Sequence, residues 1–153
     1  MKITLLFVSA LLIIFIACQK DSAEIKYSPS QVLTPGQWQL KRLTIETPPG
    51  AGAVDITNTT FDPCELDDII EFKSGGSYSC IENIIVCPVN SGIFHKLNGG
   101  NWSLSGDTLL TIVTGLNVQN FKFGKITANS IELQQTNINY LGELTRYTFL
   151  LNK

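Results

Sequence analysis

The residues with the most reactive side chains in this sequence are four cysteines and one histidine. The cysteines are Cys18, Cys64, Cys80 and Cys87, and the histidine is His95. Thiolate and imidazole groups are the ligands that zinc prefers. No C-x-x-C pair is present, although structural zinc sites draw their ligands from such closely spaced pairs. We therefore predict no metal site and no cofactor.

Catalysis is the second chemistry that these side chains could support. A serine–histidine–acid triad would have to use His95, yet the sequence has no G-x-S-x-G turn. Asp67 and Asp68 are adjacent, and neighbours in a strand point to opposite faces, so they cannot act as a paired acid and base. We interpret them as solvated residues at the start of a strand. The sequence therefore predicts no catalytic residues and a protein that is not an enzyme.

The charge balance excludes a further class of function. The chain has 153 residues with 11 Lys and Arg against 13 Asp and Glu, a net charge of −2. A nucleic-acid-binding protein would need a basic face, so we expect no nucleic-acid partner. This length fits a single domain with a real hydrophobic core.

The first 17 residues have the pattern of a signal peptide. Lys2 precedes an apolar block at residues 3–17. As a helix this block would span roughly 22 Å, which is short of the ~30 Å hydrocarbon core of a bilayer, so a secretory signal fits better than a membrane span. The block ends in Phe15-Ile16-Ala17-Cys18, which resembles the lipobox of bacterial lipoproteins. The resemblance implies that Cys18 is acylated and anchors the protein in membrane lipid. An ordinary signal peptide with a chance cysteine is the alternative.

The residues after Cys18 indicate a location and a tether. Gln19-Lys20-Asp21 resembles the export signal of Bacteroidetes lipoproteins, which implies an outer-membrane location in the cell envelope. Whether the protein faces the periplasm or the cell surface stays open. Residues 18–35 are polar, contain prolines and have no sustained period, so we expect a flexible tether before the folded domain.

From residue 36 to residue 153 the sequence predicts an all-β domain. Ile, Val and Thr dominate, and turn residues recur about every ten positions, which is typical of an antiparallel sandwich or barrel. About eight strands joined mostly by short turns favour an up-and-down meander, and closure into a barrel removes its exposed edges. Residues 48–63 are the one long irregular stretch, a candidate lid or crossover. We expect strands at residues 37–46, 67–73, 77–85, 92–96 with 101–105, 108–114, 118–127, 130–136 and 143–151.

Alternation along these strands brings aromatic side chains into one interior, because successive residues of a strand point to opposite faces. Two interpretations stay open: the aromatic residues form a packed core, or they line a cavity for a ligand. The candidate ligand-binding residues are Trp38, Phe72, Tyr78, Trp102, Phe121, Tyr147 and Phe149.

Three ordered motifs carry a resemblance to a known family. Gly36-Gln37-Trp38 resembles the G-x-W of lipocalins. Residues 64–78 (C-E-x-D-D-x-x-x-F leading to G-x-Y) and 100–109 (G-N-W-S-L leading to G-D-x-L) resemble the lipocalin-like domain of Bacteroidetes lipoproteins. The resemblance implies an eight-stranded barrel with an interior site. It also implies a basic side chain over Trp38, for which Arg146 is the candidate.

Hairpin register predicts one disulfide. A two-residue loop at Gly75-Gly76 places Cys64 opposite Cys87 on neighbouring strands, and a three-residue loop still leaves them adjacent. Opposed strand residues lie within disulfide reach, and an exported protein meets an oxidising compartment. Cys80 falls opposite Ile70 or Glu71 instead, and it is interpreted as a buried thiol, with pairing between molecules as the alternative.

Two functions follow from these observations. The first is a lipid-anchored, non-enzymatic binding protein that holds a small apolar or amphipathic ligand inside the barrel. The second is a surface interaction module with a solid core, in which the loops at residues 48–63 and 87–100 bind a partner.

Overall fold

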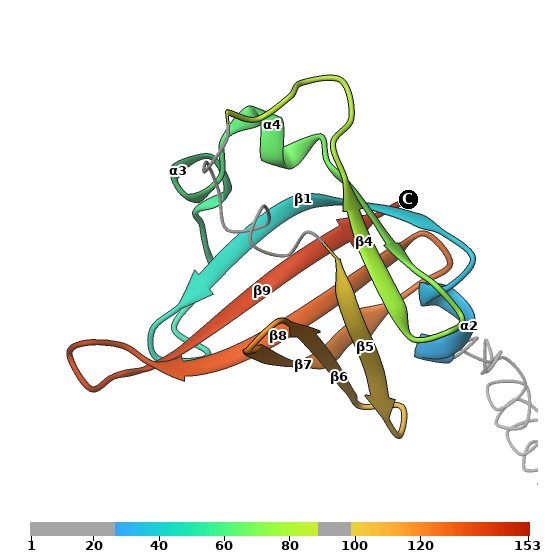
Figure 1. Ribbon diagram of the computed structural model, residues 1–153. Helices are drawn as coiled ribbons and strands as arrows, with labels where there is room; N and C mark the ends of the chain where they lie inside the picture. Colours follow the sequence, from blue (N-terminus) through green and yellow to red (C-terminus); the bar gives the residue numbers. More distant parts are fainter. Residues whose placement is uncertain (1–26, 89–98) are drawn as a thin grey trace, which may run out of the picture.

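The computed structural model describes residues 27–88 and 99–153, and strands dominate this part of the chain. Eight of the described strands form a closed antiparallel barrel in which each pairs with the next and β9 pairs back with β1 (Figure 1). This confirms the predicted fold class. The barrel strands are β1 (Gln37–Glu46), β3 (Ile69–Phe72), β4 (Ser77–Ile81), β5 (Gly100–Ser105), β6 (Leu109–Thr114), β7 (Asn117–Ile126), β8 (Ser130–Ile138) and β9 (Leu144–Asn152).

The seam between β1 and β9 closes the barrel. It runs from Gln39 opposite Asn152 to Glu46 opposite Arg146, with one irregularity between Leu40 and Arg42. An extra residue of this kind bends a strand and increases its twist, which closure requires. Strand β1 has the predicted bounds, but the strand expected to reach residue 85 already ends at Ile81. The strand expected at residues 92–96 lies outside the described residues.

The segment expected to be irregular, residues 48–63, contains short elements. They are β2 (Val54–Asp55), α3 (Thr57–Thr60) and the start of α4 (Pro63–Leu66). The backbone N–H of Leu43 donates to Thr57 Oγ1 at 2.8 Å, and the Thr57 hydroxyl donates to Asp55 Oδ1 at 2.6 Å. These bonds attach α3 to β1, so the segment is a fixed cover beside the barrel and not a free loop.

A short helix before the first strand corrects the expected tether. Helix α2 (Pro29–Leu33) begins with a proline at its first turn, where the missing N–H and the fixed φ of proline suit a helix. Pro29, Val32 and Leu33 are buried, and Trp38 Nε1 donates to the carbonyl of Leu33 at 3.0 Å. The folded domain therefore includes residues that we expected in the tether, because their apolar side chains cover one end of the barrel.

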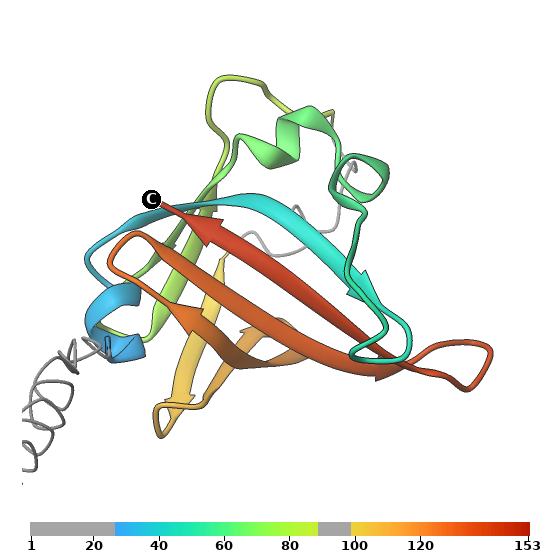
Figure 2. The ribbon, with the colours of Figure 1, turned by 180° about the vertical axis from the view of Figure 1, so that it is seen from behind.

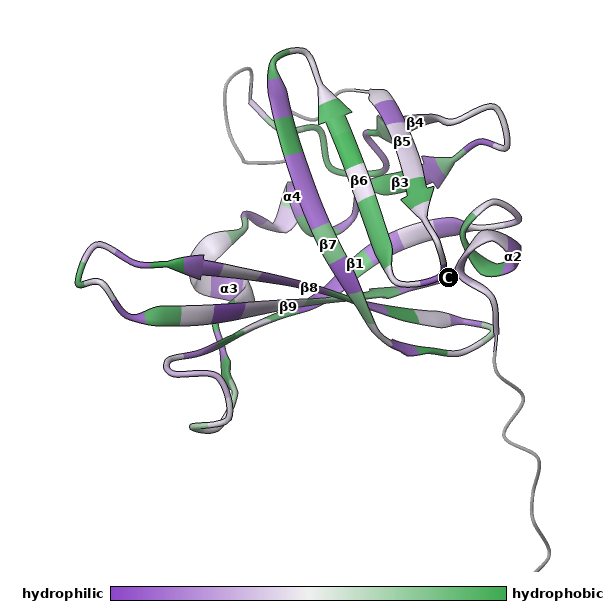
Figure 3. Cartoon of the chain, turned by 90° about the horizontal axis from the view of Figure 1, so that it is seen from below, coloured by the Kyte–Doolittle hydropathy of each residue, from purple (hydrophilic) through white to green (hydrophobic). Residues whose placement is uncertain are grey.

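The barrel has two different ends. At the closed end lie α2 and the turns β3–β4, β5–β6 and β7–β8. Figure 2 shows α2 and the C-terminus together there. At the open end lie residues 47–68, residues 82–88 (the segment after β4), and the turns β6–β7 and β8–β9. Inward side chains form the core, and the alternation with outward polar residues is visible along β7 (Figure 3).

No helix in the described ranges is both long enough and apolar enough to cross a bilayer.

Candidate functional site

The barrel encloses a cavity of about 440 Å³. Its walls come from seven of the described strands (β1, β3, β4, β6, β7, β8 and β9), with α3 and its flanking residues covering one side. Cavities that hold small organic molecules have volumes of this size. The interior is therefore not solidly packed.

The inner part of the cavity is apolar. Phe121 and Phe149 meet there edge to face, with ring centroids 5.8 Å apart, a favourable geometry for aromatic pairs. Further aliphatic walls come from Leu43, Ile70, Ile112, Leu133 and Leu151. This wall can bind hydrocarbon through the hydrophobic effect alone.

Towards the open end, the inward positions change from apolar to polar. On β7, Gln119 follows Phe121 in the direction of the open end. On β8, Gln135 and Asn137 follow Leu133. On β9 the corresponding residue is Tyr147. We call Gln119, Gln135, Asn137 and Tyr147 the polar belt. The strand alternation used for the aromatic residues could have located these polar residues, had it been extended to amide side chains.

Five of the seven aromatic candidates line the cavity. They are Phe72, Tyr78, Phe121, Tyr147 and Phe149. The other two lie elsewhere. Trp38 is fully buried beneath α2. Trp102 packs edge to face on Phe72 at 5.8 Å and donates to the carbonyls of Lys73 and Ser77.

The basic side chain over Trp38 is Lys153 and not Arg146. Lys153 Nζ lies 4.9 Å from the centre of the Trp38 ring, within the range of a cation–π interaction. Arg146 instead donates to Glu46 Oε2 at 2.5 Å. This bond and the Gly50 N–H lower the pKa of Glu46. The expectation failed because Arg146 sits at the open end, whereas Trp38 sits at the closed end.

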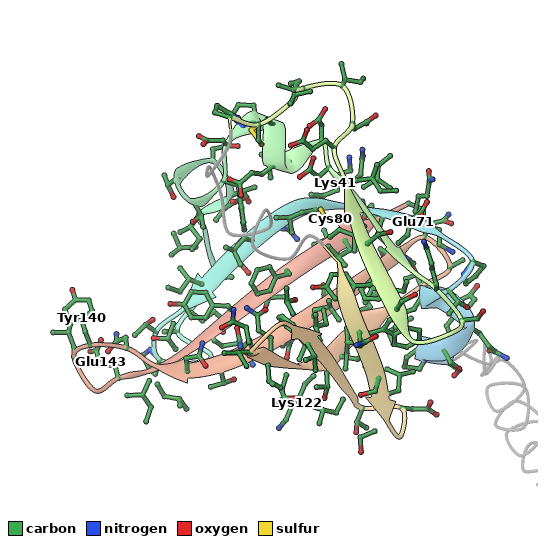
Figure 4. The ribbon with its side chains drawn as sticks, viewed as in Figure 1. Lys41, Glu71, Cys80, Lys122, Tyr140 and Glu143 are labelled. Atoms are coloured by element: carbon green, nitrogen blue, oxygen red, sulfur yellow. A yellow bond between two sulfur atoms is a disulfide. The ribbon has the colours of Figure 1, made fainter. Side chains whose placement is uncertain are left out.

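Cys80, on β4 (Figure 4), is a free thiol. Its side chain lines the cavity, as does that of Tyr78 on the same strand. Its sulfur lies 3.8 Å from Asp68 Oδ2. Burial, followed by the negative charge of Asp68, raises the pKa of the thiol to about 12. The side chain is half-buried, and the thiol keeps its proton at neutral pH.

Asp67 and Asp68 are not the solvated pair that the sequence suggested. Asp68 is 4% exposed. Asp67 is half-buried, and its Oδ2 accepts the backbone N–H groups of Ile84 and Ile85, each at 2.9 Å. Asp67 therefore fixes the segment after β4. The sequence could not show this, because the donors come from a segment that only folding brings near.

The predicted disulfide Cys64–Cys87 is present, with the two Cα atoms 5.2 Å apart. The three-residue register is the one observed, because Phe72 pairs with Tyr78, and Cys80 accordingly pairs with Ile70. Cys64 nevertheless lies in α4 and Cys87 beyond the end of β4, so neither is a strand residue. The bridge ties α4 to the segment after β4 at the open end.

The described ranges, 27–88 and 99–153, contain no cluster of three or more His, Cys, Asp or Glu side chains suited to a metal ion. Cys64 and Cys87 are bonded to each other. His95 lies outside the described residues.

Large exposed apolar side chains lie on several segments that border the open end. They come from β2, the end of β4 with the segment after it, the β6–β7 turn and the β8–β9 turn. Tyr140, at the tip of the β8–β9 hairpin, is 95% exposed (Figure 4). The others are Val54, Ile81, Ile84, Ile85, Val86, Leu116, Val118, Ile138, Leu141 and Leu144. We call these residues the apolar rim.

Comparison with known proteins identifies a family. No curated protein matches the chain. Residues 35–134 match the lipocalin-like domain, a family whose members are generally non-enzymatic binding proteins. That match covers most of the barrel, from the residues before β1 into β8. The chain therefore belongs to the family of proteins with a lipocalin-like domain.

Proposed function

We propose that this protein binds one small apolar or amphipathic molecule inside its barrel. The observation that carries the proposal is the enclosed cavity of about 440 Å³ with an apolar inner wall. An apolar void of this size leaves its lining without contacts on one side, so a fitting ligand gains dispersion and hydrophobic energy without displacing protein groups. Binding needs no catalytic residue, metal or cofactor.

Fluorescence of the neutral apolar dye N-phenyl-1-naphthylamine tests this function. We expect the folded protein to enhance the emission of the dye in a saturable way. Ile45→Trp, on the cavity wall, should weaken dye binding roughly tenfold because the larger ring fills space that the dye needs. Lys122→Trp adds the same ring on the outer face of β7 and serves as the control (Figure 4). Equal dye binding by both variants, or no binding by the folded wild type, would refute the proposal.

We further propose that Cys18 anchors the protein in the outer membrane. The lipobox-like sequence that ends at Cys18 supports this proposal. Acylation of the lipoprotein type would add more than one acyl chain, which stable anchoring requires. Metabolic labelling with palmitate should mark the wild type and leave Cys18→Ala unlabelled. Continued labelling of Cys18→Ala contradicts the anchor.

The fold indicates which end of the barrel such an anchor would tether. The chain enters the barrel through α2 at the closed end. Residues 18–28 can span at most roughly 35–40 Å when fully extended. An anchor at Cys18 would therefore keep the closed end within roughly 40 Å of the membrane.

The apolar rim favours a second candidate function, which is docking of a protein partner at the open end. Exposed apolar groups that gather in one region mark interaction sites more often than scattered ones do. Cross-linking in the native envelope should capture a defined partner with the wild type and lose it with the Leu116→Asp and Tyr140→Asp double variant. Retained dye binding shows that the variant is folded. A partner that the variant still captures would argue against this function.

A further inference from the structure

Resting on the proposed function, we infer that the molecule in the cavity is an amphiphile with an uncharged, hydrogen-bonding head group. Its hydrocarbon lies against the inner aromatic and aliphatic wall, and its head lies at the polar belt of Gln119, Gln135, Asn137 and Tyr147.

The strand register brings the belt residues together. Gln135 on β8 lies opposite Tyr147 on β9, and Asn137, two residues further along β8, points to the same side. Gln119 belongs to β7, the other neighbour of β8. Opposed residues on antiparallel strands have Cα atoms about 4.5–5.5 Å apart. One head group can therefore contact several belt residues at once.

The belt residues have hydrogen-bonding groups available for a ligand. Each amide carries an acceptor oxygen and two N–H donors, and the Tyr147 hydroxyl can both donate and accept. Within the described part of the chain, none of these four side chains has a hydrogen-bond partner. By contrast, the Tyr78 hydroxyl, also at the cavity wall, already bonds to Thr114 Oγ1. Donors and acceptors mixed in this way suit an alcohol, an amide or an ester carbonyl.

The charges around the cavity disfavour a carboxylate head. In the described ranges no Lys, Arg or His side chain lines the cavity. Arg146, next to Tyr147 on β9, alternates to the outer face and is paired with Glu46. Behind the wall at Cys80 lies the buried Asp68. A carboxylate would lose its hydration here without gaining a cation from the described part of the chain.

An ammonium head is disfavoured for the complementary reason. The cavity lining in the described ranges contains no Asp or Glu. Asp68 lies behind the sulfur of Cys80, on the β3–β4 side of the barrel, whereas the belt is on β7, β8 and β9. Among the described residues, a cation at the belt would therefore meet amide groups and no carboxylate.

A panel of ligands that differ only in their head group tests the inference. Decanol, decanamide, decanoate and decylamine are titrated at neutral pH against full-length protein loaded with N-phenyl-1-naphthylamine, and displacement of the dye is measured. We expect the alcohol and the amide to bind about tenfold or more tightly than either ion, because desolvating an unpaired charge is more unfavourable than desolvating a neutral polar group.

Variants of the polar belt test whether the head group of the ligand binds there. Gln119→Leu and Gln135→Leu should each weaken decanol binding about threefold to tenfold, while affinity for the dye is retained. Gln134→Leu makes the same change at the neighbouring position of β8, which belongs to the outer groove, and should leave decanol binding unchanged. Gln135→Arg should raise the affinity for decanoate about tenfold or more, because it supplies the missing cation.

The outcomes separate this inference from the proposed function. If dye and decanol bind but decanoate or decylamine binds equally well or better, the head-group inference is wrong and the carrier function stands. The head-group inference is also wrong if Gln134→Leu weakens decanol binding as much as Gln135→Leu does. If no ligand and no dye binds the folded protein, the proposed function itself has failed.

Discussion

At the scale of single residues, Cys80 is the side chain whose protonation depends most directly on the barrel interior. Its sulfur reaches the cavity, and its proton is retained because burial and the neighbouring Asp68 both disfavour a thiolate. A thiol with a pKa of about 12 is a poor nucleophile at neutral pH. It is therefore a structural residue, and its reactivity can serve as a probe of the folded state.

The first prediction concerns this reactivity. Iodoacetamide should modify Cys80 in the folded protein at least ~100-fold more slowly at pH 8 than in urea, where the pKa returns to about 8.5. The rate should rise about tenfold per pH unit, since only the thiolate reacts. Asp68→Asn should speed the reaction by removing the negative neighbour. Peptide mapping by mass spectrometry separates Cys80 from the other cysteines, and fast labelling at pH 7 would contradict the raised pKa.

The higher pKa of Cys80 in the folded state than in the unfolded state makes the folded protein less stable at high pH. The unfolded state loses the thiol proton first, above pH ~8.5, whereas the folded state retains it up to about pH 12. The contribution of Cys80 to the free energy of unfolding is therefore fully present below pH ~8.5 and declines as the pH rises through that window.

At the scale of elements, the open end is organised by the contacts of non-strand segments. The disulfide joins α4 to the segment after β4, and the carboxylate of Asp67 holds two backbone N–H groups of that same segment. Thr57 attaches α3 to β1. Together these contacts fix the cover that borders the cavity.

The second prediction concerns the disulfide. Replacing both Cys64 and Cys87 by Ala should lower the free energy of unfolding by about 3 kcal/mol in the chain-entropy treatment, given the 23-residue separation of the two cysteines. Urea denaturation with intrinsic fluorescence measures the change. Cys80→Ser is the control, because it alters a cysteine without opening a bridge. A reducing agent should destabilise the wild type as much as the double replacement does, and no effect of either would disprove a structural role for the bridge.

The third prediction concerns Gly100 in β5, which lies opposite Tyr78 of β4. A Cβ atom at Gly100 would lie 2.1 Å from the carbonyl oxygen of Val113 on β6 and 2.9 Å from the ring of Tyr78. Gly100→Ala should therefore lower the free energy of unfolding by about 1–3 kcal/mol through overpacking.

Gly75→Ala is the matched control for this variant. No neighbouring heavy atom lies within 4 Å of a Cβ at Gly75, so its free energy of unfolding should change by less than about 1 kcal/mol. Both variants are compared in the same urea titration. Equal stability of the two would contradict close packing around Gly100.

At the scale of the whole molecule, the cavity leaves the native barrel less densely packed than a solid core. An empty apolar space forgoes contacts that a ligand can restore. A ligand that binds only the folded state must then stabilise it by mass action. Function and stability are linked through the same cavity.

The fourth prediction follows from this linkage. Decanol at a concentration of about 100 times its Kd should raise the free energy of unfolding by about 2.7 kcal/mol. Thermal unfolding followed by circular dichroism measures the effect as a higher Tm. Ile45→Trp should show little increase at the same concentration, because its cavity is filled. A stabilisation that is equal in both proteins would indicate binding outside the cavity.

Most of the strands could be predicted because alternation is a local property. Apolar residues alternate with polar ones over parts of the strands, as at Phe121 and Phe123 of β7 and at Ile131 and Leu133 of β8, and most of the turns between strands are short. Hairpin register likewise related Cys64 to Cys87, although the observed ladder ends at Ile69 and Ile81 and the bridge lies beyond it. Helix α2 was missed because five residues have no helical period to detect, and burial against Trp38 stabilises them.

The sequence by itself determined the barrel class, the cysteine pair and the set of inward aromatic residues, because each depends on neighbours along the chain or across one turn. Only the tertiary structure decided that Lys153 and not Arg146 lies over Trp38, that Asp68 is buried, and that a cavity remains with an amide belt at its open end. These features depend on which strand ends meet when the barrel closes and on how much volume the inward side chains leave unfilled. No periodicity in the sequence encodes either quantity.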